Sequence, residues 1–225
     1  RVGRKIDAFE LRAHRGKTWS LDDFADKKLV AVAFLGTECP LAKLYGPRLQ
    51  ELSEEYAPQG VAFIGINSNR QDSLTEVGAY ARIHGVTFPL LKDGGNVVAD
   101  QFKAVRTPEV FVLDQDQTVR YWGRIDDQYG LGSSSGYARP QVKRRDLAVA
   151  LEELLSGKEF SQPAIEAPGC FIGRVPSVDP HGDVTYSNQI ARILKDRCVE
   201  CHRPGEIAPF PLTSYDDVVG WGETM

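Results

Sequence analysis

Cys39 has the residue type and the setting for thiol chemistry. It lies in GTECPLAK, directly after the apolar run LVAVAFL (29–35), which predicts a buried strand. Pro40 then marks the start of a helix. A helix N-terminus carries partial positive charge and free N–H groups, so it stabilises a thiolate over a thiol. The position therefore indicates a nucleophilic cysteine, and a buried, inert thiol is the alternative.

A second reactive group is the run CVECH, residues 198–202. C-x-x-C-H is the attachment motif for c-type haem, in which two thiols add to the vinyl groups and the histidine ligates the iron. We therefore expect Cys198 and Cys201 to bind haem c covalently in the natural protein, with His202 as an axial ligand of the iron. The alternatives are a Cys198–Cys201 disulfide, free thiols, or a zinc site, which would need two further ligands.

The elements around Cys39 alternate between strand-like and helix-like patterns, which favours an α/β layer structure. Residues 61–69 (VAFIGINSN) predict a second buried strand, parallel to 29–35 if the helix at 42–57 is a crossover. We expect that helix to bury one apolar stripe, formed by Leu44, Leu49, Leu52 and Tyr56.

The next elements continue the same unit. TPEVFVLD and VRYWGRID flank a polar turn and predict an antiparallel hairpin, after which Asp126 and Asp127 are expected in a solvated turn. Residues 130–140 (GLGSSSGYARP) are rich in Gly and Ser and predict a loop. RRDLAVALEELLSG predicts a closing helix that ends at Gly157.

Composition narrows the classes of function. Of the 225 residues, 42% are hydrophobic and 26% charged, which is enough apolar material for a core. The net charge of -4 offers no basic surface for nucleic acid. No segment approaches the roughly 18 apolar residues of a membrane span.

The composition also changes along the chain, and we predict three segments. Residues 1–157 form the α/β domain, and the proline-rich residues 158–183 form an extended tail or linker with the length to lie along it. Residues 184–225 begin a short helical, cytochrome-c-like segment. Because only 23 residues follow His202, too few to cover a haem, we expect this segment to continue beyond Met225.

Residues 1–157 resemble the thioredoxin-like superfamily, in its redoxin or alkyl hydroperoxide reductase/thiol-specific antioxidant branch. Cys39 stands where that fold holds its nucleophile, and Pro47 matches the proline that kinks the active-site helix. Thr107 and Pro108 match the threonine and cis-proline that face the nucleophile. The resemblance implies a central mixed sheet flanked by helices and a redox-active cysteine.

This chain also departs from the family pattern. Ala42 replaces the second cysteine of the thioredoxin motif, so the motif alone cannot form a disulfide. Peroxiredoxins usually carry Thr or Ser three residues before the reactive cysteine, where this chain has Gly36. Arg106 is a candidate for the arginine that polarises a peroxide, although it precedes the cis-proline. A one-cysteine peroxidase is therefore the weakest of our functional hypotheses.

Cys170, in the tail segment PGCFIGR, is a candidate partner for Cys39. An extended segment of this length can fold back across the active-site face and supply a resolving thiol from outside the motif. We therefore hypothesise a Cys39–Cys170 pair, and the alternative is a free or buried thiol that anchors the tail. A Cα separation well above about 7 Å would count against the pair.

The segment CVECHRPGEIAPFPLTSYDDV resembles the haem-motif segment of large exported bacterial proteins of planctomycete type, in which a redoxin domain precedes a cytochrome-like motif. The two resemblances together imply an exported, periplasmic or otherwise extracytoplasmic, thiol–disulfide oxidoreductase coupled to a haem c electron-transfer segment. Its partners would be thiol, disulfide or electron-transfer proteins. The alternative is an inactive redoxin-fold docking module of a larger electron-transfer or copper-monooxygenase-like protein.

Overall fold

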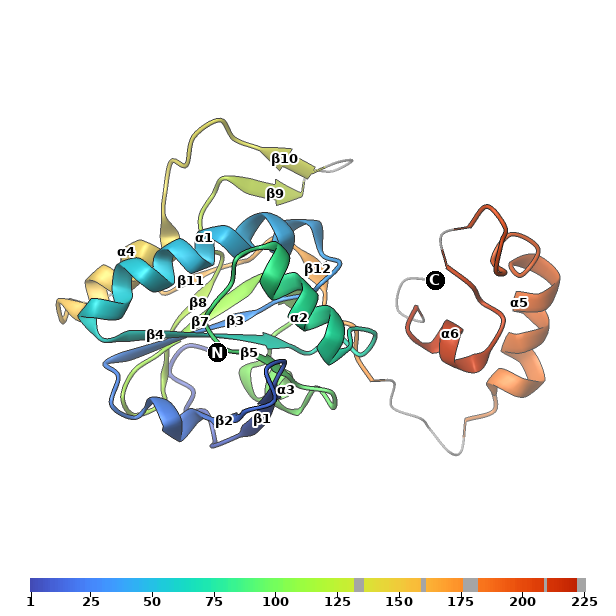
Figure 1. The fold of residues 1–225 in the computed structure, drawn as a ribbon, viewed down its shortest axis with the longest axis horizontal. Helices are drawn as coiled ribbons and strands as arrows, with labels where there is room; N and C mark the ends of the chain where they lie inside the picture. The colour runs from blue at the N-terminus through green and yellow to red at the C-terminus, as the bar shows by residue number, and fades with distance from the viewer. Residues whose placement is uncertain (132–135, 159–160, 176–181, 209, 222–225) are drawn as a thin grey trace. The chain divides into compact units, whose positions relative to one another are not determined.

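The computed structural model describes residues 1–131, 136–158, 161–175, 182–208 and 210–221 (Figure 1). The chain divides into two compact units, Arg1–Ile172 and Gly173–Met225, and each is described by itself. Two strands of the predicted tail, β11 (Ala164–Ile165) and β12 (Cys170–Phe171), belong to the first unit. The tail therefore lies along the α/β domain over these residues.

The first unit is built on an eight-stranded mixed sheet with the order β11-β8-β7-β3-β4-β5-β1-β2. Strands β3, β4 and β5 run parallel to one another, while β7 runs antiparallel to both β3 and β8. The predicted parallel pair and the predicted hairpin are both confirmed. The bounds of the remaining strands in this sheet are β1 Glu10–Ala13, β2 Thr18–Ser20, β3 Leu29–Phe34, β4 Val61–Asn67, β5 Leu90–Lys92, β7 Glu109–Leu113 and β8 Val119–Gly123.

The central strand β3 is buried along its whole length, because helices or loops cover both faces of the sheet. Its side chains alternate between two apolar clusters. Ala31 and Ala33 face the cluster that contains α1 (Pro40–Tyr56), and their small side chains let this helix approach the sheet. Val32 and Phe34 face the opposite cluster, where Phe34 packs edge-on against Phe102 and Phe111.

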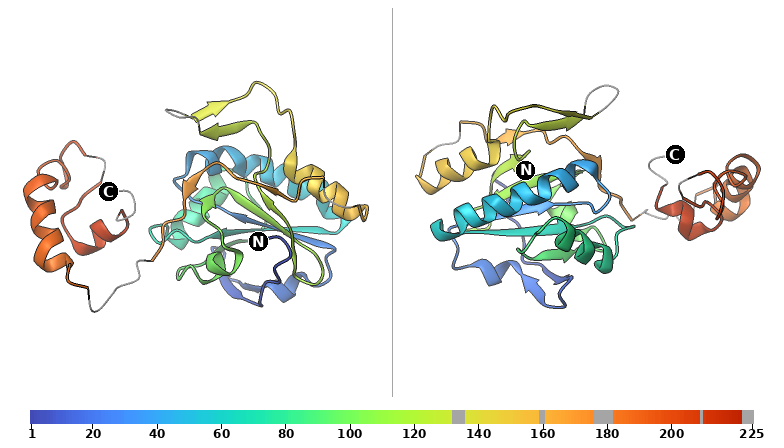
Figure 2. Two further views of the ribbon diagram at one scale, coloured as in Figure 1. Left: turned by 180° about the vertical axis from the view of Figure 1, so that it is seen from behind. Right: turned by 45° about the horizontal axis from the view of Figure 1, so that its top comes forward.

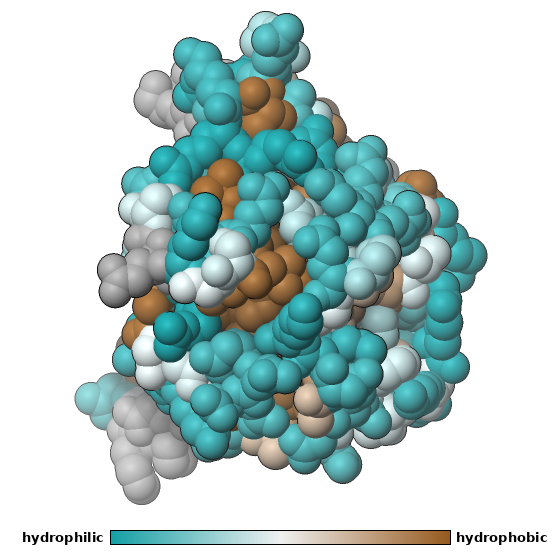
Figure 3. Space-filling view, turned by 90° about the vertical axis from the view of Figure 1, so that its left-hand side faces the viewer, coloured by the Kyte–Doolittle hydropathy of each residue, from teal (hydrophilic) through white to brown (hydrophobic). Residues whose placement is uncertain are grey.

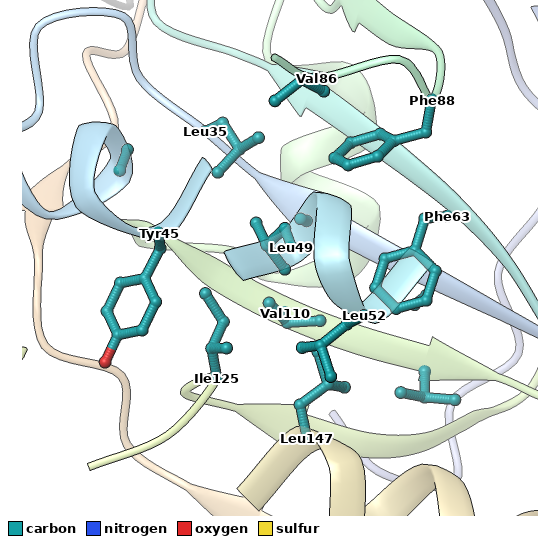
Figure 4. Packing of buried hydrophobic residues seen from close by; sticks show 14 of the residues in the cluster. Leu35, Tyr45, Leu49, Leu52, Phe63, Val86, Phe88, Val110, Ile125 and Leu147 are labelled. Carbon is teal, nitrogen blue, oxygen red and sulfur yellow. The ribbon is translucent and has the colours of Figure 1, made fainter. Parts of the chain in front are cut away.

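Helices cover the two faces of the sheet unequally. Residues of α1, α2 (Leu74–Ile83) and α4 (Asp146–Leu155) share one cluster, and α3 (Val97–Phe102), the 3-10 turn Leu21–Phe24 and the N-terminal segment share the other. Figures 1 and 2 show α1 and α4 on one side of the sheet and α3 on the other, with β1 and β2 at one edge of the sheet. In Figure 4, Tyr45, Leu49 and Leu52 of α1 lie over Val110, beside Ile125 and Leu147.

The buried stripe of α1 differs in one position from the predicted one. Leu49, Leu52 and Tyr56 are buried as expected, whereas Leu44 is 49% exposed. The stripe instead begins at Leu41 and continues through Tyr45 to Leu49. These residues are spaced four apart, so they lie on the same face of the helix. A helix over the same residues was therefore predicted correctly, with its first turn assigned to the wrong face.

The expected loop at 130–140 is not wholly irregular. β9 (Tyr129–Leu131) and β10 (Gly136–Ala138) pair antiparallel, while residues 132–135 lie outside the described part of the chain. The prediction of a solvated turn at Asp126 and Asp127 is also wrong, because both side chains are buried. Asp126 accepts hydrogen bonds from Tyr45 Oη at 2.6 Å and Arg48 Nη1 at 2.8 Å, and these fix the base of the β9–β10 hairpin.

The second unit has a π-helical turn Tyr186–Ile190 that leads into α5 (Ala191–Arg197), followed by α6 (Tyr215–Val219). Its apolar cluster is small. Leu194, Leu212 and Val218 are its buried members, with Tyr186, Ile190, Cys198 and Phe210 packed partly buried around them. The short helical segment predicted here is present within the described residues.

The face of the first unit drawn in Figure 3 is mostly polar. Figure 3 shows the end at which α1 terminates, where hydrophilic side chains surround a recess floored by apolar atoms. None of the described helices combines the length and the hydropathy needed to cross a membrane.

Candidate functional site

Cys39 occupies the junction predicted for it, between the end of β3 and the first turn of α1. It is the N-cap residue of α1, with Pro40 at the first helical position. The residue is only 4% exposed. Its Sγ lies 2.9 Å from the carbonyl oxygen of Thr107, to which the protonated form of the thiol donates a hydrogen bond. Strand and helix therefore hold the thiol against the loop that contains Thr107 and Pro108.

The Thr107–Pro108 peptide bond is cis, the conformation that the sequence predicted. The loop that contains it is held by Glu109, which is 2% exposed. One carboxylate oxygen of Glu109 accepts hydrogen bonds from the backbone N–H groups of Val105 at 2.6 Å and Arg106 at 3.1 Å. The other accepts from Trp122 Nε1 and from Arg1 Nη1. Sequence reasoning missed Glu109, although a carboxylate inside the apolar run EVFVL was a usable signal.

Cys170 lies directly beside this loop. β12 pairs antiparallel with β6 (Arg106–Thr107), in the register Cys170 opposite Thr107 and Phe171 opposite Arg106. The side chains of Cys39 and Cys170 are in hydrogen-bonding contact, and both are free thiols. The tail thus brings the second cysteine to the nucleophile, where the motif itself has Ala42.

Four contacts hold β12 in place. Arg106 Nη1 donates to the carbonyl oxygen of Gly169 at 2.8 Å, and its guanidinium lies over the Phe171 ring at 4.3 Å. The N–H of Ile172 donates to Val105 O at 2.9 Å, and the Ile172 side chain is buried in the core. Arg106, predicted as a peroxide-polarising group, here binds the strand that carries Cys170.

The surroundings of Cys39 favour its thiolate. The hydrogen bond from the Cys170 thiol is the largest cause, and it lowers the pKa of Cys39 to about 5 against the opposing effect of burial. The Thr107 hydroxyl and the backbone N–H of Ala42 also stabilise the thiolate. Thr107 Oγ1 is buried and has no other hydrogen-bond partner within the described residues.

The pKa of the Cys170 thiol shifts in the opposite direction. Its hydrogen bond to Cys39, then burial and the negative charge on Cys39, raise the pKa of the Cys170 thiol well above its ordinary value. The two cysteines therefore form a thiolate–thiol pair at neutral pH, in which Cys39 carries the charge and Cys170 the proton.

Gly36 is required by the packing beside Cys39. A Cβ at this position would lie 2.6 Å from Asn69 Nδ2 and 3.1 Å from Thr107 Oγ1. Behind it, the buried carboxylate of Asp72 accepts hydrogen bonds from the Thr37 N–H at 2.9 Å and from Asn69 Nδ2 at 3.0 Å. The Thr or Ser expected of a peroxiredoxin therefore does not fit here without a shift of these groups.

In the second unit, the backbone brings Cys198, Cys201 and His202 together in one turn. The N–H groups of Cys201 and His202 both donate to the carbonyl oxygen of Cys198, at 3.1 and 2.9 Å. His202 Nδ1 lies 3.0 Å from the carbonyl oxygen of Phe210, so Nδ1 is the nitrogen that donates and Nε2 is the one left to face a ligand. Two free thiols and this Nε2 fit the donor set of a c-type haem. No group of three His, Cys, Asp or Glu side chains within the described ranges is arranged to hold a metal ion by itself.

Comparison with known proteins agrees with the geometry of the first unit. The pattern of the AhpC/TSA family matches residues 2–122. A hypothetical protein from Sinorhizobium meliloti of known structure is 31% identical, with a TM-score of 0.69 over 79% of this chain and 96% of that protein. A putative thiol:disulfide interchange protein DsbE from Chlorobium tepidum, 16% identical with a TM-score of 0.55 over 69% of this chain and 98% of its own, shows the same fold. The predicted thioredoxin-like α/β fold is confirmed.

Two curated proteins are similar over about half of the chain. The thioredoxin-like protein YneN of Bacillus subtilis is 29% identical over 52% of this chain and 68% of its own length. The thiol-disulfide oxidoreductase ResA of Halalkalibacterium halodurans is 30% identical over 51% of this chain and 64% of its own length.

The first prediction concerns the close approach of β12 to the cis-proline loop. Gly169 has a φ of 153°, and a Cβ there would lie 2.2 Å from the Thr107 carbonyl oxygen. Gly169→Ala should therefore displace β12, lower the free energy of unfolding by about 1–3 kcal/mol and move Cys170 away from Cys39. Gly94→Ala is the matched control, because a Cβ at Gly94 meets nothing within 4 Å. Urea unfolding and the rate of intramolecular disulfide formation measure the two effects. The packing argument would be contradicted if Gly169→Ala and Gly94→Ala had the same free energy of unfolding and the same rate of disulfide formation.

The second prediction concerns the titration of Cys39. Because only the thiolate reacts with iodoacetamide, its alkylation rate should fall as the pH decreases through about 5. Cys170→Ala removes the main hydrogen-bond donor and should raise this midpoint, whereas Cys170→Ser keeps a donor and should raise it less. Mass spectrometry of the Cys39 peptide provides the readout. A midpoint that stays the same in Cys170→Ala would show that Cys170 does not stabilise the thiolate.

Proposed function

The chain belongs to the AhpC/TSA family, and on that basis we propose that its first unit is a thiol–disulfide oxidoreductase that uses Cys39 and Cys170 as its redox pair. The observation that carries the proposal is the register of β12 on β6, which sets Cys170 opposite Thr107 and in contact with Cys39. A low-pKa thiolate beside a second thiol is the arrangement that exchanges disulfides. We also propose that the substrates and partners of the whole protein are thiol, disulfide or electron-transfer proteins.

The reaction proceeds in two exchange steps. The Cys39 thiolate attacks one sulfur of a partner's disulfide, a mixed disulfide forms, and the partner's other sulfur leaves as a thiolate. Cys170 then loses its proton to that leaving thiolate and attacks the Cys39 sulfur, which releases the second partner thiol. The pair becomes a Cys39–Cys170 disulfide and the partner a dithiol, so two electrons have moved.

The alternative is a docking module that has lost catalysis. The burial of Cys39 is the observation that favours it, since an entering disulfide must reach a residue only 4% exposed. The depressed pKa of Cys39 favours the catalytic reading, because an inert buried thiol would have a raised pKa. A one-cysteine peroxidase has less support, because Arg106 is engaged by Gly169 and Phe171 and a side chain at position 36 would meet Asn69.

We further propose that the second unit carries haem c and that the protein works outside the bacterial cytoplasm. Cys198 and Cys201 would hold the porphyrin covalently, and His202 Nε2 would ligate the iron. Bound there, a haem supplies one-electron transfer. Support comes from the Nδ1 hydrogen bond of His202 and from large apolar side chains left exposed around the motif, which are Val184, Ile193, Ile207, Tyr215 and Trp221.

The third prediction tests the redox pair in the 225-residue chain. Equilibration with dithiothreitol buffers of graded potential should yield one two-electron transition that joins the Cys39 and Cys170 peptides in non-reduced mass spectra. Cys39→Ser should slow the reduction of a protein disulfide such as that of insulin by about 30-fold at pH 7, because a thiol of ordinary pKa is only about 3% thiolate there. Cys198→Ser/Cys201→Ser is the matched control and should retain the activity. If Cys39 reacts only after unfolding and pairs with nothing, the docking module is the better account.

The fourth prediction tests the haem site. Expression in bacteria together with a haem-ligation system should give a chain that retains its haem through denaturation, with the absorption spectrum of a c-type haemochrome. Cys198→Ala/Cys201→Ala should lose the covalent haem, and His202→Ala should alter the spectrum by loss of an iron ligand. Cys170→Ala is the control that leaves both readouts unchanged. Absence of covalent haem in the unsubstituted chain would exclude the assignment.

A further inference from the structure

We infer that the first unit has a second binding site, a groove between the β1–β2 turn and the C-terminal half of α2 that binds a small organic phosphate. The groove has a volume of about 420 Å³. It is lined by His14 and Arg15 of the turn, by Gly78, Ala81 and Arg82 of α2, and by Thr87 of the loop after α2. The redox pair lies on α1 and β12, so the inference stands independently of the proposed function.

The first argument is the charge of the groove. Arg15 and Arg82 supply two guanidinium groups, and no Asp or Glu belongs to the lining. Within the described part of the chain, neither arginine forms an ion pair. The chain as a whole has a net charge of -4, so these two groups make a local excess of positive charge. An anion that enters the groove therefore meets cations that no carboxylate of the protein neutralises.

The second argument is the orientation of His14. Its Nδ1 lies 3.4 Å from the carbonyl oxygen of Leu90 in β5, so Nδ1 is the nitrogen that donates to the protein. The Cδ2 atom, which neighbours Nε2 in the ring, lies 3.5 Å from the point that a Cβ of Gly78 would occupy. The edge of the ring that carries Nε2 therefore faces α2 across the groove. Nε2 becomes a second donor when the imidazole is protonated beside an anion.

The third argument is the glycine on the floor of the groove. Gly78 lies inside α2, where glycine is less favourable than alanine. A Cβ there would meet His14 Cδ2 at 3.5 Å and Arg82 Nη1 at 3.7 Å, which are ordinary van der Waals distances. Alanine would therefore fit and would favour the helix. Glycine instead leaves open the one space that both the imidazole and the guanidinium border.

Helix capping accounts for only one of the three basic side chains. Arg82 is in the last turn of α2, where a cation interacts favourably with the helix dipole. His14 and Arg15 belong to the β1–β2 turn, and the fold brings this distant segment against α2. Basic groups that converge from two segments on one groove are the arrangement of a binding site for an anion.

The remaining lining residues favour a phosphate that carries a small carbon skeleton. Thr87 Oγ1 accepts a hydrogen bond from Gln50 Nε2 at 2.8 Å, so its own proton is left for an acceptor in the groove. Two guanidinium groups and a hydroxyl suit the several oxygens of a phosphate better than the two of a carboxylate. Ala81 and Val86 are buried and give the groove an apolar part for the carbon skeleton.

The fifth prediction is that the 225-residue chain binds glycerol 3-phosphate at one site, measured by isothermal titration calorimetry at low ionic strength in a buffer free of phosphate. Arg15→Gln and Arg82→Gln should each weaken binding about tenfold or more, because each removes a charged hydrogen-bond donor. Arg12→Gln is the matched control, because Arg12 is also exposed but lies in β1 outside the lining. It should change the affinity by less than about twofold.

Three results would overturn the inference. The first is a titration without binding. The second is an equal loss of affinity in Arg12→Gln and Arg82→Gln, which would indicate general attraction of anions to basic side chains. The third is equal affinity for glycerol 3-phosphate and inorganic phosphate, which would show that the groove does not recognise an organic ligand.

Gly78→Ala tests the groove without removing a charge. Its methyl group should fill the space between His14 and Arg82 and favour the helix, so the variant should unfold at the same or a higher temperature than the unsubstituted chain. Its affinity for glycerol 3-phosphate should nevertheless fall by about threefold or more, because the ligand loses that space. Gly94→Ala, where a Cβ meets nothing within 4 Å, should bind as the unsubstituted chain does. Unchanged binding in Gly78→Ala would contradict the placement of the ligand in this groove.

Discussion

The pairing of β12 with β6 is the interaction on which the candidate site depends. The contact between Cys39 and the cis-proline loop does not depend on this pairing. The second thiol reaches Cys39 only because the pairing sets Cys170 opposite Thr107. The same contact separates the two pKa values, since the Cys170 thiol donates to Cys39 and keeps its own proton. In a C-x-x-C motif, one helical turn places the second thiol next to the nucleophile. Here the pairing of two strands places Cys170, which is far from Cys39 in the sequence, in that position.

Two buried carboxylates hold the backbone around this contact. Glu109 binds the N–H groups of Val105 and Arg106, and Asp72 binds the N–H of Thr37. Burying a carboxylate is costly unless hydrogen bonds satisfy its oxygens, and both of these groups are satisfied by donors at fixed positions. Their arrangement makes the loops on either side of Cys39 rigid. A thiolate needs such rigidity, because its stabilisation depends on donors that stay in place.

The sequence was sufficient to predict features that local patterns encode. The strands at 29–35 and 61–69 and the placement of Cys39 between strand and helix needed only hydrophobic runs and helix-start signals. The roles of Gly169 and Asp72 needed contacts between distant segments, for which one sequence offers no spacing rule. Leu44 was placed on the wrong face because the true stripe of α1 begins at Leu41, within a helix start rich in apolar residues.

The second unit presents a different physical problem. Leu194, Leu212 and Val218 are its only buried apolar residues among those described, while Ile193 and Ile207 are more than half exposed. A segment this small rarely folds stably on such a core, and natural small domains add a metal, a disulfide or a cofactor. The haem that we propose at Cys198, Cys201 and His202 would bury part of the apolar surface that Ile193 and Ile207 leave exposed, and it would stabilise the segment in that way.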